Sequence, residues 1–196
     1  TLSALLLAFG CAQLVLGPLS DRFGRRPVLL VGLAAYVLAA IASAAAPTMQ
    51  LLIVARTLQG AAMGAAVMCA RAIVRDLYAP AAGARVMSRA LRGLGVIACL
   101  CAPLGSLLAT YLGWRHALLV LAVFGAGTLA LVALRFHETV PAKNPRALQL
   151  GTLLPTWRGI LHNRSFQAFT LLTCGFYGLL FTLLASSSFM FIQRLG

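Results

Sequence analysis

Six long apolar stretches divide the chain of 196 residues. Each can form a helix that crosses the ~30 Å hydrocarbon core of a bilayer, which takes about 20 residues. Strands of a membrane barrel would alternate apolar and polar residues over about ten positions instead. The stretches are Leu2–Leu19, Val28–Ala46, Gln50–Val74, Val86–Leu112, His116–Leu134 and Phe166–Ile192. The sequence therefore predicts an all-α polytopic membrane protein with six transmembrane helices.

Composition excludes most other classes of protein. Apolar residues make up 61% of the chain and charged residues only 10%, whereas about 25% of an ordinary soluble domain is charged. Sixteen Lys and Arg residues face three acidic ones, an excess also found in nucleic-acid-binding proteins. Here the basic residues lie in short clusters between apolar stretches. The chain begins with Thr1 and enters an apolar stretch at once, so we expect it to be a piece of a longer protein.

The basic residues are distributed unequally between the two sides of the predicted membrane. Ten lie in the connections after the first, third and fifth stretches, two lie on the opposite side, and four fall within the stretches. Because Lys and Arg accumulate in cytoplasmic loops, these three connections are expected in the cytoplasm. This topology accounts for the basicity, and no nucleic-acid partner is expected.

The connection Arg135–Arg164 differs from the others. It begins with polar residues such as His137 and Glu138, which indicate a flexible linker. Apolar residues then recur at helical spacing, opposite basic ones, which predicts a short amphipathic helix. That helix lies either in the cytoplasmic membrane interface or against the cytoplasmic ends of the other helices. The apolar members are Leu153, Leu154, Trp157, Ile160 and Leu161.

The segment Gly17–Pro27 is the most specific motif, with the sequence GPLSDRFGRRP. We expect Gly17-Pro18 to end one helix, Gly24 to form a tight turn, and Pro27 to begin the next helix. Asp21 lies four residues before Arg25, so the two can pair. The alternative is that the arginines only anchor the turn on the cytoplasmic side.

This segment resembles the loop between the second and third helices of the major facilitator superfamily. Arg56-Thr57-Leu58-Gln59-Gly60 resembles the family's Arg-x-x-Gln-Gly motif in the fourth helix. Ala102-Pro103 and Gly105 resemble, in altered form, the fifth-helix motif that kinks the helix in drug/proton antiporters. The whole pattern is most similar to the bicyclomycin/chloramphenicol-resistance branch.

The resemblance implies that the chain holds helices two to seven of a twelve-helix transporter. Residues 1–134 would be helices two to six of the N-terminal half, and residues 135–165 the central cytoplasmic linker with its amphipathic helix. Residues 166–196 would be the first helix of the C-terminal half. The missing first helix and the rest of the C-terminal half would then be partners of this chain.

The resemblance also implies a cytoplasmic gate that latches the two halves of the transporter together. Its residues would be Gly17, Asp21, Arg22, Gly24, Arg25, Arg26 and Asp76. By this match, Asp21 meets a helix end in the second half, and Arg25 bridges Asp21 to Asp76. Only three acids exist, and two of them lie at cytoplasmic helix ends beside arginines. We therefore predict that Asp21, Arg25 and Asp76 form one network.

Arg56 is a costly residue within an apolar stretch, because a buried Arg costs ~2.5–3.5 kcal/mol on insertion scales. Gln59 and Gly60 follow at helical spacing and share its face. Arg56 either supports a packed helix interface or faces the cavity and tunes the proton affinity of a nearby carboxylate. No acid of this chain falls at hydrocarbon depth. In the family branch that carboxylate is on the first helix, so we expect this chain alone to be inactive.

The resemblance implies proton-driven export of small amphipathic drugs across the bacterial inner membrane by alternating access, without a cofactor. Its partners would be the drug-like substrate, protons and lipid. The alternatives are an exporter of a metabolite such as a sugar or amino acid, or a membrane-embedded enzyme or scaffold. No nucleophile–base pair, metal cluster or phosphate loop appears in the sequence. Aromatic residues of the last stretch either line a drug cavity or face lipid; the candidates are Phe176, Tyr177 and Phe181.

Overall fold

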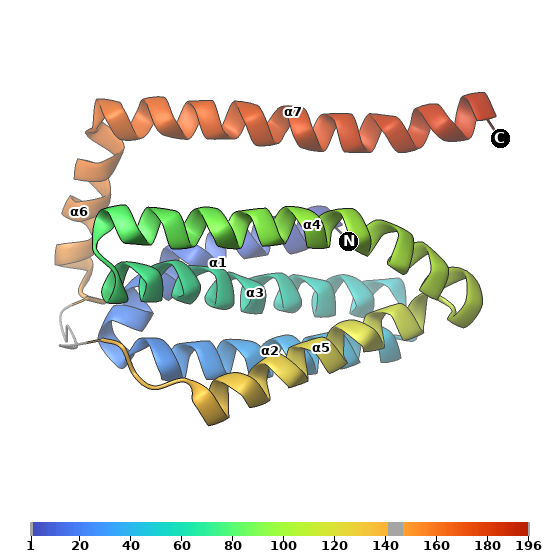
Figure 1. The fold of residues 1–196 in the computed structure, drawn as a ribbon, viewed down its shortest axis with the longest axis horizontal. Coiled ribbons are helices and arrows are strands. Elements are labelled where there is room, and N and C mark those ends of the chain that lie inside the picture. The colour runs from blue at the N-terminus through green and yellow to red at the C-terminus, as the bar shows by residue number, and fades with distance from the viewer. Residues whose placement is uncertain (1, 141–146, 196) are drawn as a thin grey trace. The chain divides into compact units, whose positions relative to one another are not determined.

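The computed structural model describes residues 2–140 and 147–195, and all regular structure in these ranges is helical (Figure 1). The chain divides into two compact units, Thr1–Ala147 and Leu148–Gly196. The first unit contains α1 (Leu2–Phe23), α2 (Arg25–Ala45), α3 (Met49–Leu77), α4 (Pro80–Leu112) and α5 (Trp114–Arg135). The second contains α6 (Leu150–His162) and α7 (Arg164–Leu195).

The prediction of an all-helical membrane protein is confirmed. Within the described residues, α1 to α5 are long and apolar enough to cross a bilayer, and they correspond to the first five predicted stretches. The sixth stretch, Phe166–Ile192, falls within α7. Several side chains of α7 lie outside the described residues, so its crossing of the membrane stays a prediction.

The turn between α1 and α2 is shorter than predicted. Gly17-Pro18 does not end the first helix, because α1 continues through Pro18 to Phe23. Proline removes one backbone donor, a loss that membrane helices tolerate. Pro27 is the third residue of α2 rather than the first. Gly24 alone connects the two helices, which brings the charged residues onto the helix ends.

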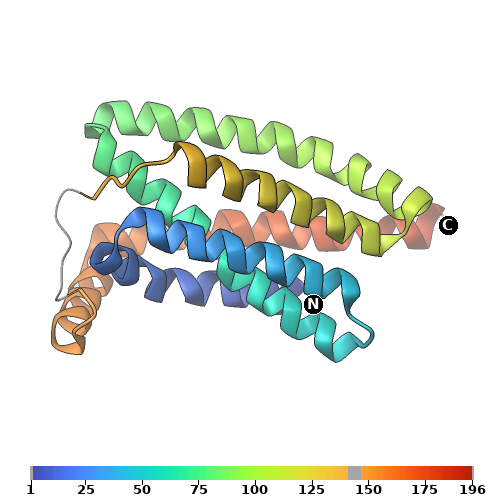
Figure 2. The same ribbon diagram turned by 90° about the horizontal axis from the view of Figure 1, so that it is seen from below.

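The basic residues after the third stretch also lie on helices rather than in a loop. Arg75 is in the last turn of α3, while Arg85 and Arg89 are in α4, and only Tyr78 and Ala79 connect the two helices. Pro80 begins α4, where its missing N–H costs no hydrogen bond. Figure 2 shows the α1–α2 turn, the α3–α4 turn and the end of α5 at one end of the first unit. The positive-inside rule assigns this end to the cytoplasm.

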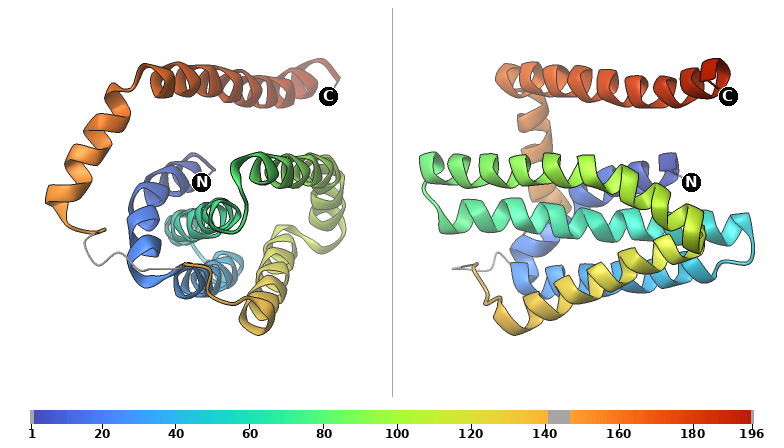
Figure 3. Two further views of the ribbon diagram at one scale, coloured as in Figure 1. Left: turned by 60° about the vertical axis from the view of Figure 1, so that its left-hand side comes forward. Right: turned by 45° about the vertical axis from the view of Figure 1, so that its right-hand side comes forward.

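Helix α3 lies beside both α1 and α2, which pack against it more than against each other (Figure 3). Small residues permit this approach. A Cβ atom at Gly60 would meet the Leu5 carbonyl of α1, and one at Gly64 would lie 3.0 Å from the Phe9 carbonyl oxygen. The α1–α3 crossing is therefore a contact of backbone against backbone.

The predicted kink motif lies in α4. Pro103 is inside this helix, and Figure 1 shows α4 bending toward its C-terminal end. A Cβ atom at Gly105 would have no neighbour within 4 Å among the described residues. No described helix therefore packs closely on α4 at Gly105, and the role of Pro103 and Gly105 as a kink motif stays a prediction.

The predicted amphipathic helix is present as α6, which the structure places in the same compact unit as α7. The two helices meet at Asn163, whose side-chain oxygen accepts hydrogen bonds from the backbone of Ser165 (2.9 Å) and Phe166 (3.3 Å). This is an N-cap for α7. Residues 141–146 of the predicted linker lie outside the described residues.

Candidate functional site: an ionic network around Arg25

The turn at Gly24 determines the geometry of the site. Gly24 has φ 108° and ψ 159°, a region of backbone space that essentially only glycine occupies. A Cβ atom here would also collide with the Glu138 carboxyl group, whose Cδ would lie only 2.9 Å away. Glycine at this position therefore lets Arg25 begin α2 directly after α1 ends.

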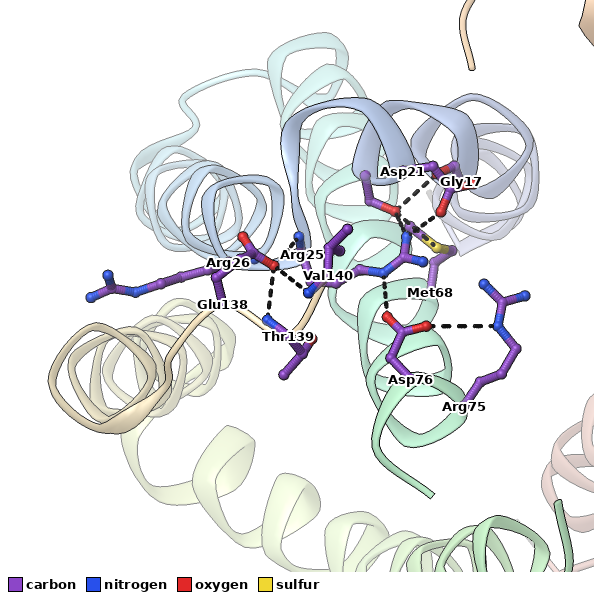
Figure 4. A network of polar contacts seen from close by, with 11 residues as sticks. Gly17, Asp21, Arg25, Arg26, Met68, Arg75, Asp76, Glu138, Thr139 and Val140 are labelled. Atoms are coloured by element: carbon purple, nitrogen blue, oxygen red, sulfur yellow. Dashed lines mark hydrogen bonds and ion pairs between the residues drawn. The ribbon is translucent and has the colours of Figure 1, made fainter. Parts of the chain in front are cut away.

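The Arg25 side chain connects three helices (Figure 4). Its Nη1 lies 2.6 Å from Oδ1 of Asp21 on α1, and its Nε lies 3.0 Å from Oδ2 of Asp76 on α3. The Arg25 side chain is 5% exposed, Asp76 is 14% exposed and Asp21 is 44% exposed. The predicted contact of these three residues is thus confirmed, and Asp21 is its most accessible member.

Ser20 is a further member of this network. Its hydroxyl accepts a hydrogen bond from Arg25 Nη1, and it lies 2.9 Å from the Gly17 carbonyl oxygen, to which it can donate. Ser20 is fully buried. Ser20 lies within the Gly17–Pro27 motif but is not among the predicted gate residues, because an uncharged hydroxyl gives no sign in the sequence of a contact with Arg25. Arg75 is peripheral, with Nε 3.9 Å from Asp76 Oδ1 and its side chain 74% exposed.

The third acidic residue, Glu138, binds the backbone end of the same arginine. Its carboxylate accepts hydrogen bonds from the backbone N–H groups of Arg25 (2.9 Å) and Arg26 (3.2 Å). It also accepts from Thr139 (3.0 Å) and Val140 (3.2 Å). The N–H groups of Arg25 and Arg26, in the first turn of α2, have no partner within the helix. The negative charge of Glu138 also interacts favourably with the positive end of the α2 dipole. Glu138 is therefore the cap of α2.

Burial opposes ionisation of Glu138, but the hydrogen bonds from Arg25, Val140, Arg26 and Thr139 outweigh it and lower its pKa. These contacts hold the first part of the predicted linker, at Glu138, against the start of α2. Glu138 fixes the segment after α5 to the start of α2, and all three acids of the chain contact Arg25. The scarcity of acids was the one sequence signal that could have revealed this.

The other predicted gate arginines point elsewhere. Arg26 Nη2 donates to the Ala133 carbonyl oxygen at 3.0 Å, which satisfies an orphan acceptor in the last turn of α5. The Arg22 guanidinium lies over the Phe23 ring, 5.4 Å from its centroid. Within the described residues neither arginine forms an ion pair with Asp21 or Asp76.

A polar cavity of about 340 Å³ lies beside the network, between α1 and α3. Asp21 and Arg25 form part of its wall, so the network is accessible from this side. Two further cations, Arg71 and Arg75, also line it. The remaining lining residues are Gln13, Gly17, Met68 and Ala72.

Arg56, Gln59 and Gly60 lie together near the opposite end of α3. Arg56 is half-buried, and its Nη1 donates to Gln59 Oε1 at 3.0 Å. Gln59 is buried, and Gly60 packs on the backbone of Leu5. In the part of the chain that the structure describes, Arg56 has no acidic partner.

The predicted aromatic residues of α7 belong to the second unit. The Phe176 and Tyr177 rings meet edge to face, with centroids 5.9 Å apart and an interplanar angle of 83°. Both side chains are exposed. The Phe181 side chain lies outside the described residues.

The family is decided by comparison with known proteins. Residues 1–196 match the Major Facilitator Superfamily over their whole length. The chain belongs to this superfamily. The family resemblance predicted from the loop, Arg56 and Pro103 motifs is thereby confirmed.

Two bacterial relatives and one solved structure show how far the similarity extends. The chain is 34% identical to Multidrug resistance protein D of Escherichia coli, over 89% of the chain and 43% of that protein. It is 36% identical to a chloramphenicol resistance protein of Pseudomonas aeruginosa, over 79% and 37%. The human organic anion transporter MFSD10 (TETRAN) has a similar fold, with a TM-score of 0.62 and 28% identity over 77% of this chain and 35% of that one.

Family membership and the apolar helices establish a multi-pass membrane protein. The chain spans less than half the length of these bacterial relatives.

Proposed function

We propose that the full-length protein exports small amphipathic drug-like molecules across the bacterial inner membrane in exchange for protons. Family membership supports a transporter rather than an enzyme. The names of the two bacterial relatives, a multidrug and a chloramphenicol resistance protein, support drug-like substrates. Alternating access with a site between the two halves is the mechanism expected for such a fold, and it requires no cofactor.

The observation that carries the mechanism is the network at the cytoplasmic end of the first unit. Arg25 holds Asp21 and Asp76, which joins the ends of α1, α2 and α3. Asp21 remains 44% exposed beside a polar cavity, so it has room for a group from elsewhere in the protein. We infer that Asp21 is the reversible half of a cytoplasmic latch, while Arg25 and Asp76 hold it in position.

Arg56 and the aromatic residues have proposed roles in the membrane-embedded cavity. The Arg56 charge has a neutral partner, Gln59, which leaves its field available to a carboxylate from another part of the protein. A proton-carrying acid beside Arg56 would have a lowered proton affinity. The exposed rings of Phe176 and Tyr177 are suited to apolar substrates, and Phe181 is a further candidate from the sequence alone.

The test is drug accumulation and drug-induced proton movement in membranes that contain the full-length protein. Asp21→Lys is expected to abolish drug export, because it replaces the acid of the latch by a cation, without preventing insertion. Arg75→Gln is the matched control, since this residue shares the cavity but lies at the edge of the network. Normal drug export by Asp21→Lys would refute the latch hypothesis. Drug export by the wild type at a rate that does not depend on the proton gradient would contradict proton coupling.

A further inference from the structure

Two tight turns of the first unit are built in the same way. Gly24 alone connects α1 to α2, and Gly113 alone connects α4 to α5. Their backbone conformations are alike, with φ 108° and ψ 159° at Gly24 and φ 84° and ψ 159° at Gly113. The two turns lie at opposite ends of the unit (Figure 1), so the α4–α5 turn belongs to the outer face of the membrane. The two helix pairs are therefore the same element in opposite orientations.

Helices α2 and α5, which follow these glycines, pack against each other in antiparallel directions (Figure 1). Tyr36 and Gly125 each lie twelve residues after the glycine of their own turn, and they meet in the middle of the crossing. A Cβ atom at Gly125 would lie only 2.8 Å from the Tyr36 ring and 3.1 Å from Cγ2 of Val37. Because equivalent positions meet there, the two helices are related by an approximate two-fold axis at this contact.

An arginine occupies the same position at the start of each helix. Arg26 is the second residue after Gly24, and its Nη2 donates to the Ala133 carbonyl oxygen in the last turn of α5 at 3.0 Å. Arg115 is the second residue after Gly113, and its Nη2 donates to the Ala46 carbonyl oxygen at the end of α2 at 3.3 Å. Each arginine thus begins one helix of the pair and binds the end of the other.

The end of α2 needs a partner of this kind. Ala46 is the C-cap residue of α2 and is only 4% exposed, and the last carbonyl groups of a helix have no acceptor partner within it. The last turn of α2 consists of Ala and Ser, so Arg115 of α5 supplies the cation that stabilises a helix C-terminus. The Arg115 guanidinium also lies 4.5 Å from the centroid of the Trp114 ring, a contact that helps to hold it in place.

We propose that Arg26 and Arg115 are equivalent clamps that hold α2 to α5 at both faces of the membrane. With the Tyr36–Gly125 contact between them, they fix the pair at three points along about 30 Å of helix. The two helices therefore tilt together instead of separating at one end, and a displacement at the cytoplasmic network reaches the outer face. That consequence rests on the proposed alternating access, whereas the clamp itself does not.

The test is hydrogen–deuterium exchange of the full-length protein in lipid nanodiscs, measured by mass spectrometry without drug or proton gradient. Arg115→Gln should accelerate amide exchange in the last turn of α2, and Arg26→Gln in the last turn of α5. Each acceleration should be about three- to tenfold, the factor that corresponds to ~0.7–1.4 kcal/mol for one hydrogen bond. The end that keeps its arginine should exchange as in the wild type.

Arg85→Gln is the matched control, because this arginine donates to the Ala81 carbonyl oxygen of its own helix, α4, and should change neither end. Gly125→Ala should accelerate exchange at both ends by separating the helices at their centre, whereas Gly127→Ala, with open space around it, should not. Unchanged exchange in both arginine variants would overturn the proposal. So would an effect confined to the helix that carries the substitution, or equal effects of one arginine variant at both ends. Because the measurement uses neither drug nor proton gradient, its result is separate from that of the export assay.

Discussion

Replacing Arg25 by alanine tests whether the ionic network stabilises the first unit. Removing one partner of a buried ion pair typically costs 3–5 kcal/mol, because the other charge stays buried without compensation. Asp76, at 14% exposure, is such a charge. The pair with Asp21 is half-exposed and adds at most about 1 kcal/mol. Arg75, at 3.9 Å from Asp76, can move in and recover part of the loss.

We therefore expect Arg25→Ala to lower the free energy of unfolding by about 3–4 kcal/mol. The same measurement on Arg75→Ala should show a change below about 1 kcal/mol, because that side chain is 74% exposed and exposed ion pairs contribute little. The assay is reversible unfolding of the full-length protein by a denaturing detergent. A double-mutant cycle with Asp76→Ala isolates the pair. Equal effects of the two arginine variants, or no coupling between Arg25 and Asp76, would refute the assignment of Arg25 as the centre of the network.

Two further predictions concern the α1–α2 turn and the α1–α3 crossing. The pKa of Glu138 is lowered in the folded protein, so its carboxylate stabilises the fold above its unfolded value of about 4.5, and this contribution is lost as the pH falls through the folded pKa. The difference in stability between wild type and Glu138→Gln, measured as acid unfolding, should accordingly disappear once the pH lies below the folded pKa of Glu138. A difference that stays constant with pH would contradict the role of Glu138 as the cap of α2. Gly24→Ala and Gly60→Ala should each lower stability by about 1–3 kcal/mol, from backbone strain and from overpacking respectively. Gly127→Ala is the control and should not lower stability, because a Cβ atom at Gly127 has open space around it. Equal decreases in the melting temperature of all three variants would contradict the predicted strain and clashes.

Hydrophobicity and charge determined most of what the sequence could predict. Apolar stretches long enough to span a bilayer can only be helical in lipid, so the positions of the apolar helical segments were predictable to within a few residues. Their ends were not, because polar residues such as Asp21 and Arg85 are compatible with both a loop and an exposed helical turn. The structure extends α1 to Phe23 and begins α4 at Pro80.

The site was predictable where its members are neighbours in sequence or match a motif. Asp21 and Arg25 are four residues apart in the sequence, which is about one helical turn. Asp76 is the other acid that lies at a predicted helix end. Glu138 contacts Arg25 across 113 residues, and no periodicity links positions that far apart. Such a contact depends on how α5 packs against α2, which local sequence does not encode.

The charge balance of this chain explains why Asp21, Asp76 and Glu138 all contact Arg25. Thirteen net positive charges repel one another, and the cytoplasmic end concentrates them. A buried guanidinium is stable there only if it is neutralised, and Asp21 and Asp76 do so for the Arg25 side chain. Glu138 then neutralises the positive end of the α2 dipole at the backbone of the same residue. Because these contacts join α1, α2, α3 and the segment after α5, the cytoplasmic end of the first unit is expected to move as one body, as rocking of one half against the other requires.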